Sequence, residues 1–135
     1  MQPKQHLEFV TVDMKPESGW EVPPGYPPGF TQKILASDID ETAKCGSRTR
    51  LLKLEPGAFS TVPFVHDHWE EVFLVQGDLI VGNDGQGQGG QASNAFTYAC
   101  RPPGAHHGPF TSRTGCLLYE IHYYETSGVK RQPDC

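Results

Sequence analysis

The chain has 135 residues, a length that suits one globular domain with a substantial hydrophobic core. Its formal net charge of -5 and its isoelectric point near 5.6 argue against nucleic acid or an anionic membrane surface as the main partner. No apolar stretch is long enough to span a membrane, and residues 1–10 lack the apolar core of a secretory signal. We therefore expect a cytoplasmic protein whose partner is a small-molecule substrate or ligand, with no nucleic acid and no membrane.

A proline-rich segment comes first in the chain. Residues 21–30 read Glu-Val-Pro-Pro-Gly-Tyr-Pro-Pro-Gly-Phe, and proline at this density excludes a central strand because it cannot donate a ladder hydrogen bond. Trp20, Tyr26 and Phe30 give the segment large apolar anchors. The sequence predicts an N-terminal arm that packs on its own domain or on a partner subunit.

Short strand-like runs separated by glycine and proline follow the arm. Helical periodicity is weak throughout, and the chain holds 15 glycines and 12 prolines, which break it into short segments. The predicted strands cover residues 48–54, 59–66, 71–81, 96–101 and 116–124. Residues 82–90 are rich in glycine and predict a hairpin loop. They do not predict a phosphate-binding loop, because no Lys-Ser/Thr pair and no helix follow them. Such a set of strands protects its edges by closing into a barrel or a double sheet.

The most informative residues are histidines in two separate parts of the chain. His66 and His68 stand one residue apart just ahead of a predicted strand, and His107 follows a Pro-Pro-Gly turn. His66, His68 and Glu70 alternate, and alternate residues of an extended chain share one face. Two imidazoles and a carboxylate on one apolar face are costly unless something compensates them. A divalent metal ion is the commonest compensation.

Two spaced patterns resemble the motifs of the cupin superfamily. They read Gly57-x8-His66-x-His68-x-Glu70-x6-Gly77, similar to the first cupin motif, and Pro102-x-Gly104-x2-His107, similar to the second. The resemblance spans residues 48–124, and residues 101–110 are especially similar to the cupin domain of zinc-binding anti-sigma factors. It implies an all-β fold, the double-stranded β-helix or cupin jelly-roll barrel, preceded by the proline-rich arm.

The same resemblance implies that residues 1–135 form a single cupin domain. Residues 1–47 would hold the arm and the first strands, residues 48–124 the barrel core, and residues 125–135 a polar tail. Closed point-group symmetry with two subunits is the commonest assembly of soluble proteins, so we expect a homodimer.

Cupins typically hold one metal ion with three histidines and one glutamate. Carried over by position, His66, His68 and His107 match the histidines, and Glu70 matches the glutamate when counted back from the glycine that follows it. The family usually places more residues between the second histidine and the glutamate, so Glu71 is an alternative ligand and a three-histidine centre is another alternative. One divalent ion is implied, and Fe, Mn, Zn and Ni all accept this ligand set.

Other polar residues are candidates for catalysis and substrate binding. His122 in the last predicted strand is a candidate proton carrier, and Glu71 is the other catalytic candidate. Arg50, Arg101 and Tyr98 are candidates for substrate binding, since an arginine inside a barrel binds a carboxylate through two parallel hydrogen bonds. The competing interpretations are a solvated strand face for the arginines, and packing or exposure for His122 and Tyr98.

Three neutral imidazoles and one carboxylate leave coordination positions open for water, substrate or O₂. The resemblance therefore implies a metal-dependent dioxygenase or related oxidoreductase that acts on a small oxygenated organic substrate. The alternatives are a non-catalytic metal-binding or ligand-sensing module, and an isomerase or lyase that uses the metal as a Lewis acid. Resemblance in fold does not choose among them, because one barrel supports many chemistries.

Overall fold

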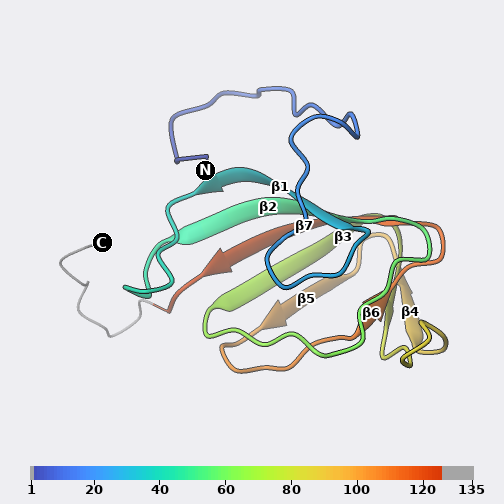
Figure 1. Ribbon diagram of the computed structural model, residues 1–135. Coiled ribbons are helices and arrows are strands. Elements are labelled where there is room, and N and C mark those ends of the chain that lie inside the picture. Colours follow the sequence, from blue (N-terminus) through green and yellow to red (C-terminus); the bar gives the residue numbers. More distant parts are fainter. Residues whose placement is uncertain (1, 126–135) are drawn as a thin grey trace.

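A computed structural model describes residues 2–125, which form an all-β structure (Figure 1). The strands are β1 (Phe30–Ser37), β2 (Ser47–Leu54), β3 (Trp69–Val81), β4 (Gln91–Asn94), β5 (Tyr98–Arg101), β6 (Phe110–Thr111) and β7 (Cys116–Tyr123). Among these described residues there is no helix with the length and apolar character needed to cross a membrane. The predicted tail, residues 125–135, lies outside the described residues apart from its first position.

The strands form two antiparallel layers that share β3. The first part of β3 pairs with β7 on one side and with β5 on the other. Its second part pairs with β4 and β6. Because β7 also pairs with β2, and β2 with β1, the larger layer runs in the order β1-β2-β7-β3-β5. The predicted all-β class is confirmed.

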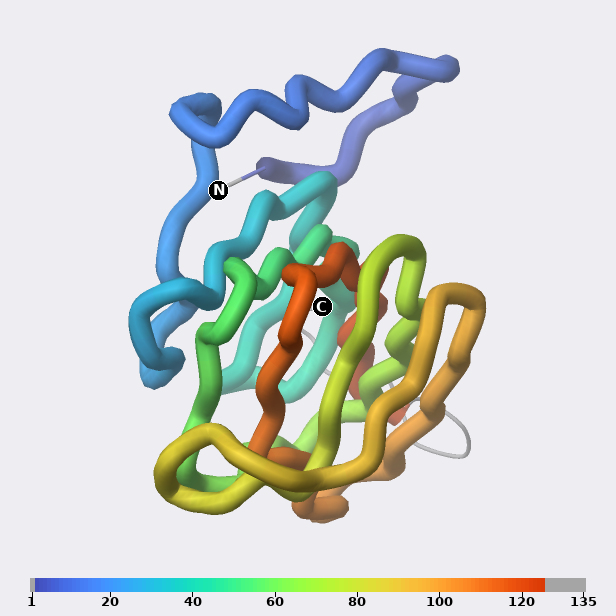
Figure 2. The backbone as a smooth tube through the Cα atoms, turned by 90° about the vertical axis from the view of Figure 1, so that its right-hand side faces the viewer, coloured from blue at the N-terminus to red at the C-terminus, as the bar shows by residue number. Residues whose placement is uncertain are grey.

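The N-terminal arm has two parts. From Glu21 onward it packs on the domain, where Glu21 bridges to Gln32 at the outer edge of β1 and Tyr26 packs against the core. The residues that precede Trp20 are mostly exposed, and Figures 1 and 2 both show them projecting beyond β1.

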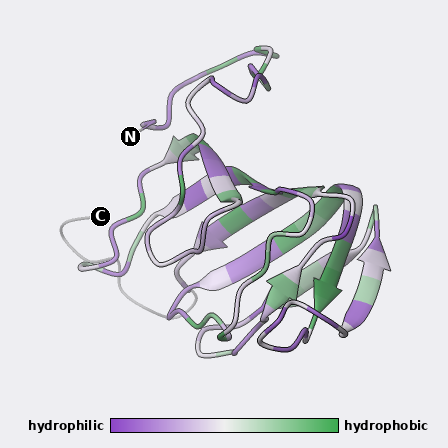
Figure 3. Cartoon of the chain, turned by 45° about the vertical axis from the view of Figure 1, so that its right-hand side comes forward, coloured by the Kyte–Doolittle hydropathy of each residue, from purple (hydrophilic) through white to green (hydrophobic). Residues whose placement is uncertain are grey.

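Apolar side chains fill the space between the layers, and Figure 3 shows the hydrophobic stretches gathered on the strands. The buried cluster consists of Phe30, Leu52, Leu54, Val72, Leu74, Leu79, Phe110, Cys116 and Leu118. Alternate residues of β2, β3 and β7 supply most of it, as the pleat requires. The polar residues described below lie at one end of this apolar core.

The strand predicted over residues 59–66 is absent, and this segment forms isolated bridges in its place. The sequence predicts a strand over residues 59–66, but this stretch forms only isolated bridges, at Phe59 with Thr111 and at Phe64 with His107. Pro63 lacks an amide donor, so a regular ladder cannot run through the segment. The other predicted strands are confirmed with small shifts of their ends, and β1 lies in the part of the chain expected to hold the first strands. The short strands β4 and β6 fall outside the predicted ranges.

Gly77 lies where β3 passes from one layer to the other. Its φ of 85° lies in the left-handed region, and a Cβ there would sit 2.0 Å from the carbonyl oxygen of Gly115. A register shift between Leu74 and Gln76 precedes it, and such bulges increase the local twist. Glycine at position 77 therefore permits both the bend and the close approach of β7.

Gly77→Ala and Gly82→Ala make a matched pair, because Gly82 has nearly the same φ, 87°, with nothing near its missing Cβ. Gly82→Ala should lower the free energy of unfolding by about 1–2 kcal/mol, the penalty for a left-handed residue. Gly77→Ala should cost roughly 3 kcal/mol or more, because the clash with Gly115 adds to that penalty. Urea unfolding followed by circular dichroism measures both values. Equal losses would show that the backbone at Gly77 has free space around it.

Candidate metal centre

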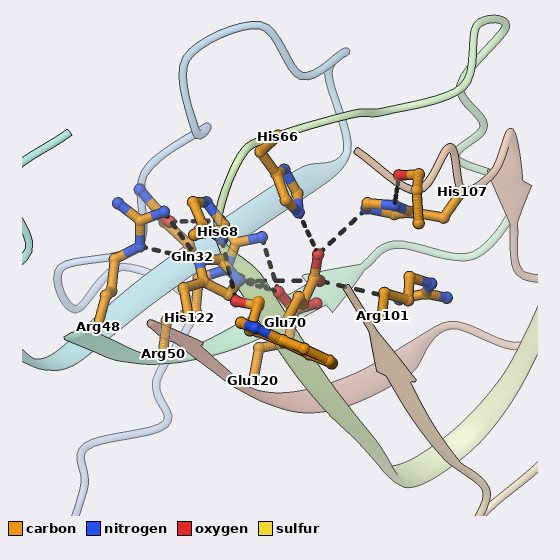
Figure 4. Close-up of polar contacts among 12 residues, drawn as sticks. Gln32, Arg48, Arg50, His66, His68, Glu70, Arg101, His107, Glu120 and His122 are labelled. Carbon is orange, nitrogen blue, oxygen red and sulfur yellow. Dashed lines mark hydrogen bonds and ion pairs between the residues drawn. The ribbon is translucent and has the colours of Figure 1, made fainter. Parts of the chain in front are cut away.

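The two histidine segments meet because their backbones pair. The amide of Phe64 donates to the carbonyl of His107 at 2.7 Å, and the amide of His107 donates back to Phe64 at 2.9 Å. The amide of Gly104 also donates to the carbonyl of His66 at 2.9 Å. These bonds hold both histidines at the end of the barrel where β3 begins, and where Glu70 points toward them (Figure 4).

Glu70 is the centre of a buried polar cluster. Its Oε2 lies 2.6 Å from Nε2 of His66 and 3.1 Å from Nε2 of His107. Burial raises the pKa of Glu70, but the imidazoles of His107, His122 and His66 around it outweigh burial and hold the pKa well below its ordinary value. Glu70 is therefore an ionised carboxylate at neutral pH.

His107 directs an unprotonated nitrogen at this carboxylate when its ring is neutral. Its Nδ1 lies 3.2 Å from the carbonyl oxygen of Ala105, which can only accept, so Nδ1 carries the proton. The lone pair of Nε2 then faces Oε2 of Glu70 across 3.1 Å. Two electron-rich atoms at this separation need a positive charge beside them, either an extra proton on the imidazole or a cation.

A divalent cation fits this arrangement. His66, Glu70 and His107 each offer one ligand atom, and these atoms lie within 4.8 Å of one another. Imidazole and carboxylate together suit Fe, Mn, Ni and Zn. Three protein ligands leave further coordination positions for small molecules, which is the pattern of a catalytic centre rather than a closed structural one.

His68, a predicted ligand, lies beside this group rather than within it. Regular strand structure begins only at Trp69, and residues 67–68 form a bend, so the alternation expected of an extended chain is not kept. The His68 ring stacks on His66 at 4.1 Å and on His122 at 4.8 Å, and its Nδ1 donates to the carbonyl of Trp69 at 3.0 Å. Burial lowers the pKa of His68 to about 4, so the ring is neutral at pH 7.

Arg48 sets the protonation state of His122. It donates to Nδ1 of His122 through Nε at 3.1 Å and through Nη2 at 2.8 Å. Because a guanidinium cannot accept, Nδ1 is unprotonated and the proton of the neutral ring sits on Nε2, which donates to Glu120 at 3.0 Å. Glu70, Glu120 and His122 also lie close enough to share a cation, but a protonated Nε2 cannot be a ligand. The first group is therefore the better metal site.

Solved structures share this arrangement of strands. An acetylacetone dioxygenase from Acinetobacter johnsonii superposes with a TM-score of 0.59 at 20% identity, over 96% of this chain and 87% of that chain. An RmlC-like cupin from Shewanella frigidimarina gives 0.59 at 20% identity, over 94% and 97%. The chain has the cupin fold. A cupin-superfamily sugar phosphate isomerase from Silicibacter pomeroyi gives 0.53 at 24% identity, over 72% and 60%.

The cupin assignment predicted from the two motifs is thus confirmed at the level of the fold. No family model matches the sequence, and no curated relative matches it either. At these identities the likeness concerns the arrangement of the chain, and the chemistry of this protein has to be argued from its own residues.

Arg50, a predicted substrate-binding candidate, donates hydrogen bonds to other residues of the chain. Its Nε and Nη2 donate to Oε1 of Glu120 at 2.9 and 2.8 Å. Nη1 donates to Gln32 at 2.8 Å, and Nη2 also donates to the hydroxyl of Tyr26 at 3.0 Å. The sequence analysis missed the polar roles of Gln32 and Tyr26, because nothing in a local pattern distinguishes a buried acceptor from a surface residue or an apolar anchor.

Glu71 and Tyr98 lie on the outer face of the larger layer. The Tyr98 hydroxyl donates to Oε1 of Glu71 at 2.6 Å, and the Tyr123 hydroxyl donates to Oε2 at 2.8 Å. Successive residues of a strand point to opposite faces, so the inward position of Glu70 places Glu71 outward. The sequence analysis considered ligand and catalytic roles for Glu71 and a substrate-binding role for Tyr98, and the structure places both side chains on the face opposite to Glu70.

A pocket extends from Glu70 into the space between the layers. Its polar lining comes from Tyr26, Glu70, Arg101, His107 and Glu120, and its remaining lining is apolar. Arg101, predicted to bind substrate, lies at this pocket with Nη1 4.0 Å from Oε1 of Glu70.

His66→Ala and His107→Ala should each weaken metal binding at least about tenfold, because each removes one of three candidate ligands. His106→Ala is the matched control, since His106 is the exposed neighbour of buried His107 and should leave metal affinity unchanged. Elemental analysis of untagged protein and titration with a competing chelator measure the effect. Unchanged metal content in His107→Ala would rule out this ligand set.

Proposed function

We propose that this cupin is a metal-dependent dioxygenase that acts on a small oxygenated organic substrate. One observation supports the proposal above the others. His66, Glu70 and His107 converge from separate segments, and two of them, Glu70 and His107, line a pocket whose remaining walls are largely apolar. The bound divalent ion would supply a Lewis acid and a redox-active centre for O₂ chemistry. The shared fold with an acetylacetone dioxygenase is consistent with this class of reaction.

The residues of the chain position the substrate and exclude water. Leu52, Val72 and Leu118 form part of the apolar wall, which displaces water from the substrate and strengthens polar contacts inside the pocket. Nε2 of His122 carries a proton and lies 3.7 Å from Oε1 of Glu70. Arg48 keeps His122 in the tautomer whose Nε2 proton is donated to Glu120, so this imidazole holds the side chain of Glu120 in place beside Glu70.

An isomerase or lyase is the second candidate function, and the cupin sugar phosphate isomerase with the same fold is the observation in its favour. A Lewis-acid reaction of that kind needs a free base beside the pocket. Glu120 is the nearest further carboxylate, but its Oε1 accepts two hydrogen bonds from Arg50 and one from His122. Oxygen chemistry, which does not depend on such a base, is therefore better supported.

Protein reconstituted with Fe(II) without oxygen should consume O₂ when it is mixed with the correct member of a panel of dicarbonyls, catechols and hydroxy acids. An oxygen electrode follows the reaction. His66→Ala should reduce the rate about 100-fold or more, since it removes one ligand of the centre, whereas His106→Ala should retain it. Turnover of a substrate without O₂ uptake would favour the isomerase or lyase. Stoichiometric zinc with no turnover of any kind would favour a binding or sensing module.

We also propose that two copies of the chain associate through the outer face of the larger layer. This face carries exposed apolar side chains, namely Phe73, Val75, Phe96, Tyr98 and Tyr119. The projecting arm carries another set, namely Leu7, Phe9, Val10 and Met14. A twofold interface requires both complementary halves on one chain, and an apolar face together with an apolar arm meets that requirement.

Light scattering after size-exclusion chromatography should report about twice the chain mass of 14.9 kDa. Phe73→Glu should shift the protein toward the monomer, because it places a charge at the centre of the apolar face. Val62→Glu is the control, since Val62 is also exposed, at 66%, but lies in a loop outside that face. A wild-type monomer at micromolar concentration, or equal shifts for both variants, would contradict the proposed interface.

A further inference from the structure

Arg101 is a cation at the pocket with no hydrogen-bonded acceptor among residues 2–125. Its Nη1 lies 4.0 Å from Oε1 of Glu70, beyond hydrogen-bonding distance, and its guanidinium carbon lies 5.7 Å from the centre of the Phe110 ring. The side chain is only 19% exposed. By contrast, Arg48 and Arg50 both donate to side chains on β7. Arg101 therefore keeps its donors available at the pocket.

The charges around the pocket leave a positive excess once the metal centre is filled. Glu120 and Arg50 neutralise each other at 2.8 Å, which leaves the negative charge of Glu70 and the positive charge of Arg101. A divalent cation held beside Glu70 would add two positive charges in a partly buried space. Uncompensated charge of this kind is costly, so a ligand with two negatively charged or strongly polarised oxygen groups is favoured.

The position and shape of the Arg101 guanidinium favour a carboxylate as one of the two oxygen groups of the ligand. A guanidinium offers parallel N–H donors that match the two oxygens of a carboxylate, and contact with Phe110 supports its planar group. Only a few ångströms separate Arg101 from Glu70, so one small molecule can reach both the arginine and the metal centre. The apolar remainder of the pocket suits a short hydrocarbon portion.

We propose that Arg101 binds the carboxylate of the substrate, and that the substrate is a small carboxylic acid with a second oxygen close by. Short 2-oxo, 2-hydroxy and 3-oxo acids belong to this class. The carboxylate pairs with Arg101, and the second oxygen lies toward His66, Glu70 and His107. This inference rests on the proposed metal centre and narrows its substrate class, and it makes Arg101 a determinant of specificity.

Calorimetric titration of the zinc-loaded protein tests this inference without any turnover. The two probes are acetoacetate and methyl acetoacetate, which share a carbon skeleton but differ in the negative charge. Wild-type protein should bind the acid at least about tenfold more tightly than the ester, as expected for a hydrogen-bonded charge pair. Arg101→Gln should weaken binding of the acid roughly 10- to 100-fold and leave binding of the ester unchanged.

Arg101→Lys keeps the charge but loses the paired donors, so it should recover part of the affinity for the acid. Arg113→Gln is the matched control, because Arg113 is exposed and does not line the pocket. Zinc content and circular dichroism of each variant confirm that the centre and the fold are intact.

Equal binding of acid and ester by the wild type, binding of neither probe, or unchanged acid affinity in Arg101→Gln would each overturn the inference. The proposed reaction fails separately. The preference for the acid can depend on Arg101 while the Fe(II) protein never consumes O₂. That result would contradict the dioxygenase proposal and support the carboxylate site at Arg101. If the protein takes up no zinc and still shows the Arg101-dependent preference, the proposed metal centre is contradicted and the carboxylate site at Arg101 is supported.

Discussion

The buried carboxylate of Glu70 is the constraint on which the site depends. Its side chain is 4% exposed, and an ionised group at that depth has to be surrounded by positive charge or by hydrogen-bond donors. Nε2 of His66 lies 2.6 Å from Oε2 of Glu70, and Nε2 of His107 lies 3.1 Å from the same oxygen. His107 directs a lone pair there because Ala105 takes the proton of its other nitrogen. The buried carboxylate and the imidazole lone pair beside it together favour binding of a cation. The guanidinium of Arg101 at the same pocket favours a ligand that carries negative charge.

Two cross-strand pairs between β2 and β7 keep this arrangement in one protonation state. Arg50 lies opposite Glu120, and Arg48 lies opposite His122, in adjacent rows of the same antiparallel ladder. The first pair neutralises a second buried carboxylate, which would otherwise compete for the cation. The second pair fixes the tautomer of His122 and so removes its Nε2 from the possible ligands. Removing one partner of a buried ion pair such as Arg50 with Glu120 costs about 3–5 kcal/mol.

The alternation of β3 gives the two faces of the larger layer different roles. Glu70 and Val72 point inward, to the cluster and the core, whereas Glu71 and Phe73 point outward. Tyr98 and Tyr123 donate hydrogen bonds to the outward carboxylate, so the outer face carries one hydrogen-bonded carboxylate among apolar side chains. One strand therefore serves both the proposed catalytic pocket and the proposed dimer surface.

The sequence by itself determined the all-β class and the cupin fold, because glycine and proline positions and motif spacing are local properties of the chain. It also identified His66, Glu70 and His107, which the structure brings within 4.8 Å of one another. Only the tertiary structure decided which polar residues are free. His68 lies beside the candidate ligand group because the chain bends at residues 67–68. Arg50 donates hydrogen bonds to Glu120, whereas the contact of Arg101 with Glu70 is a longer ion pair of 4.0 Å. These outcomes depend on contacts such as Arg48 with His122, 74 residues apart, and a one-dimensional pattern carries no information about which donor meets which acceptor.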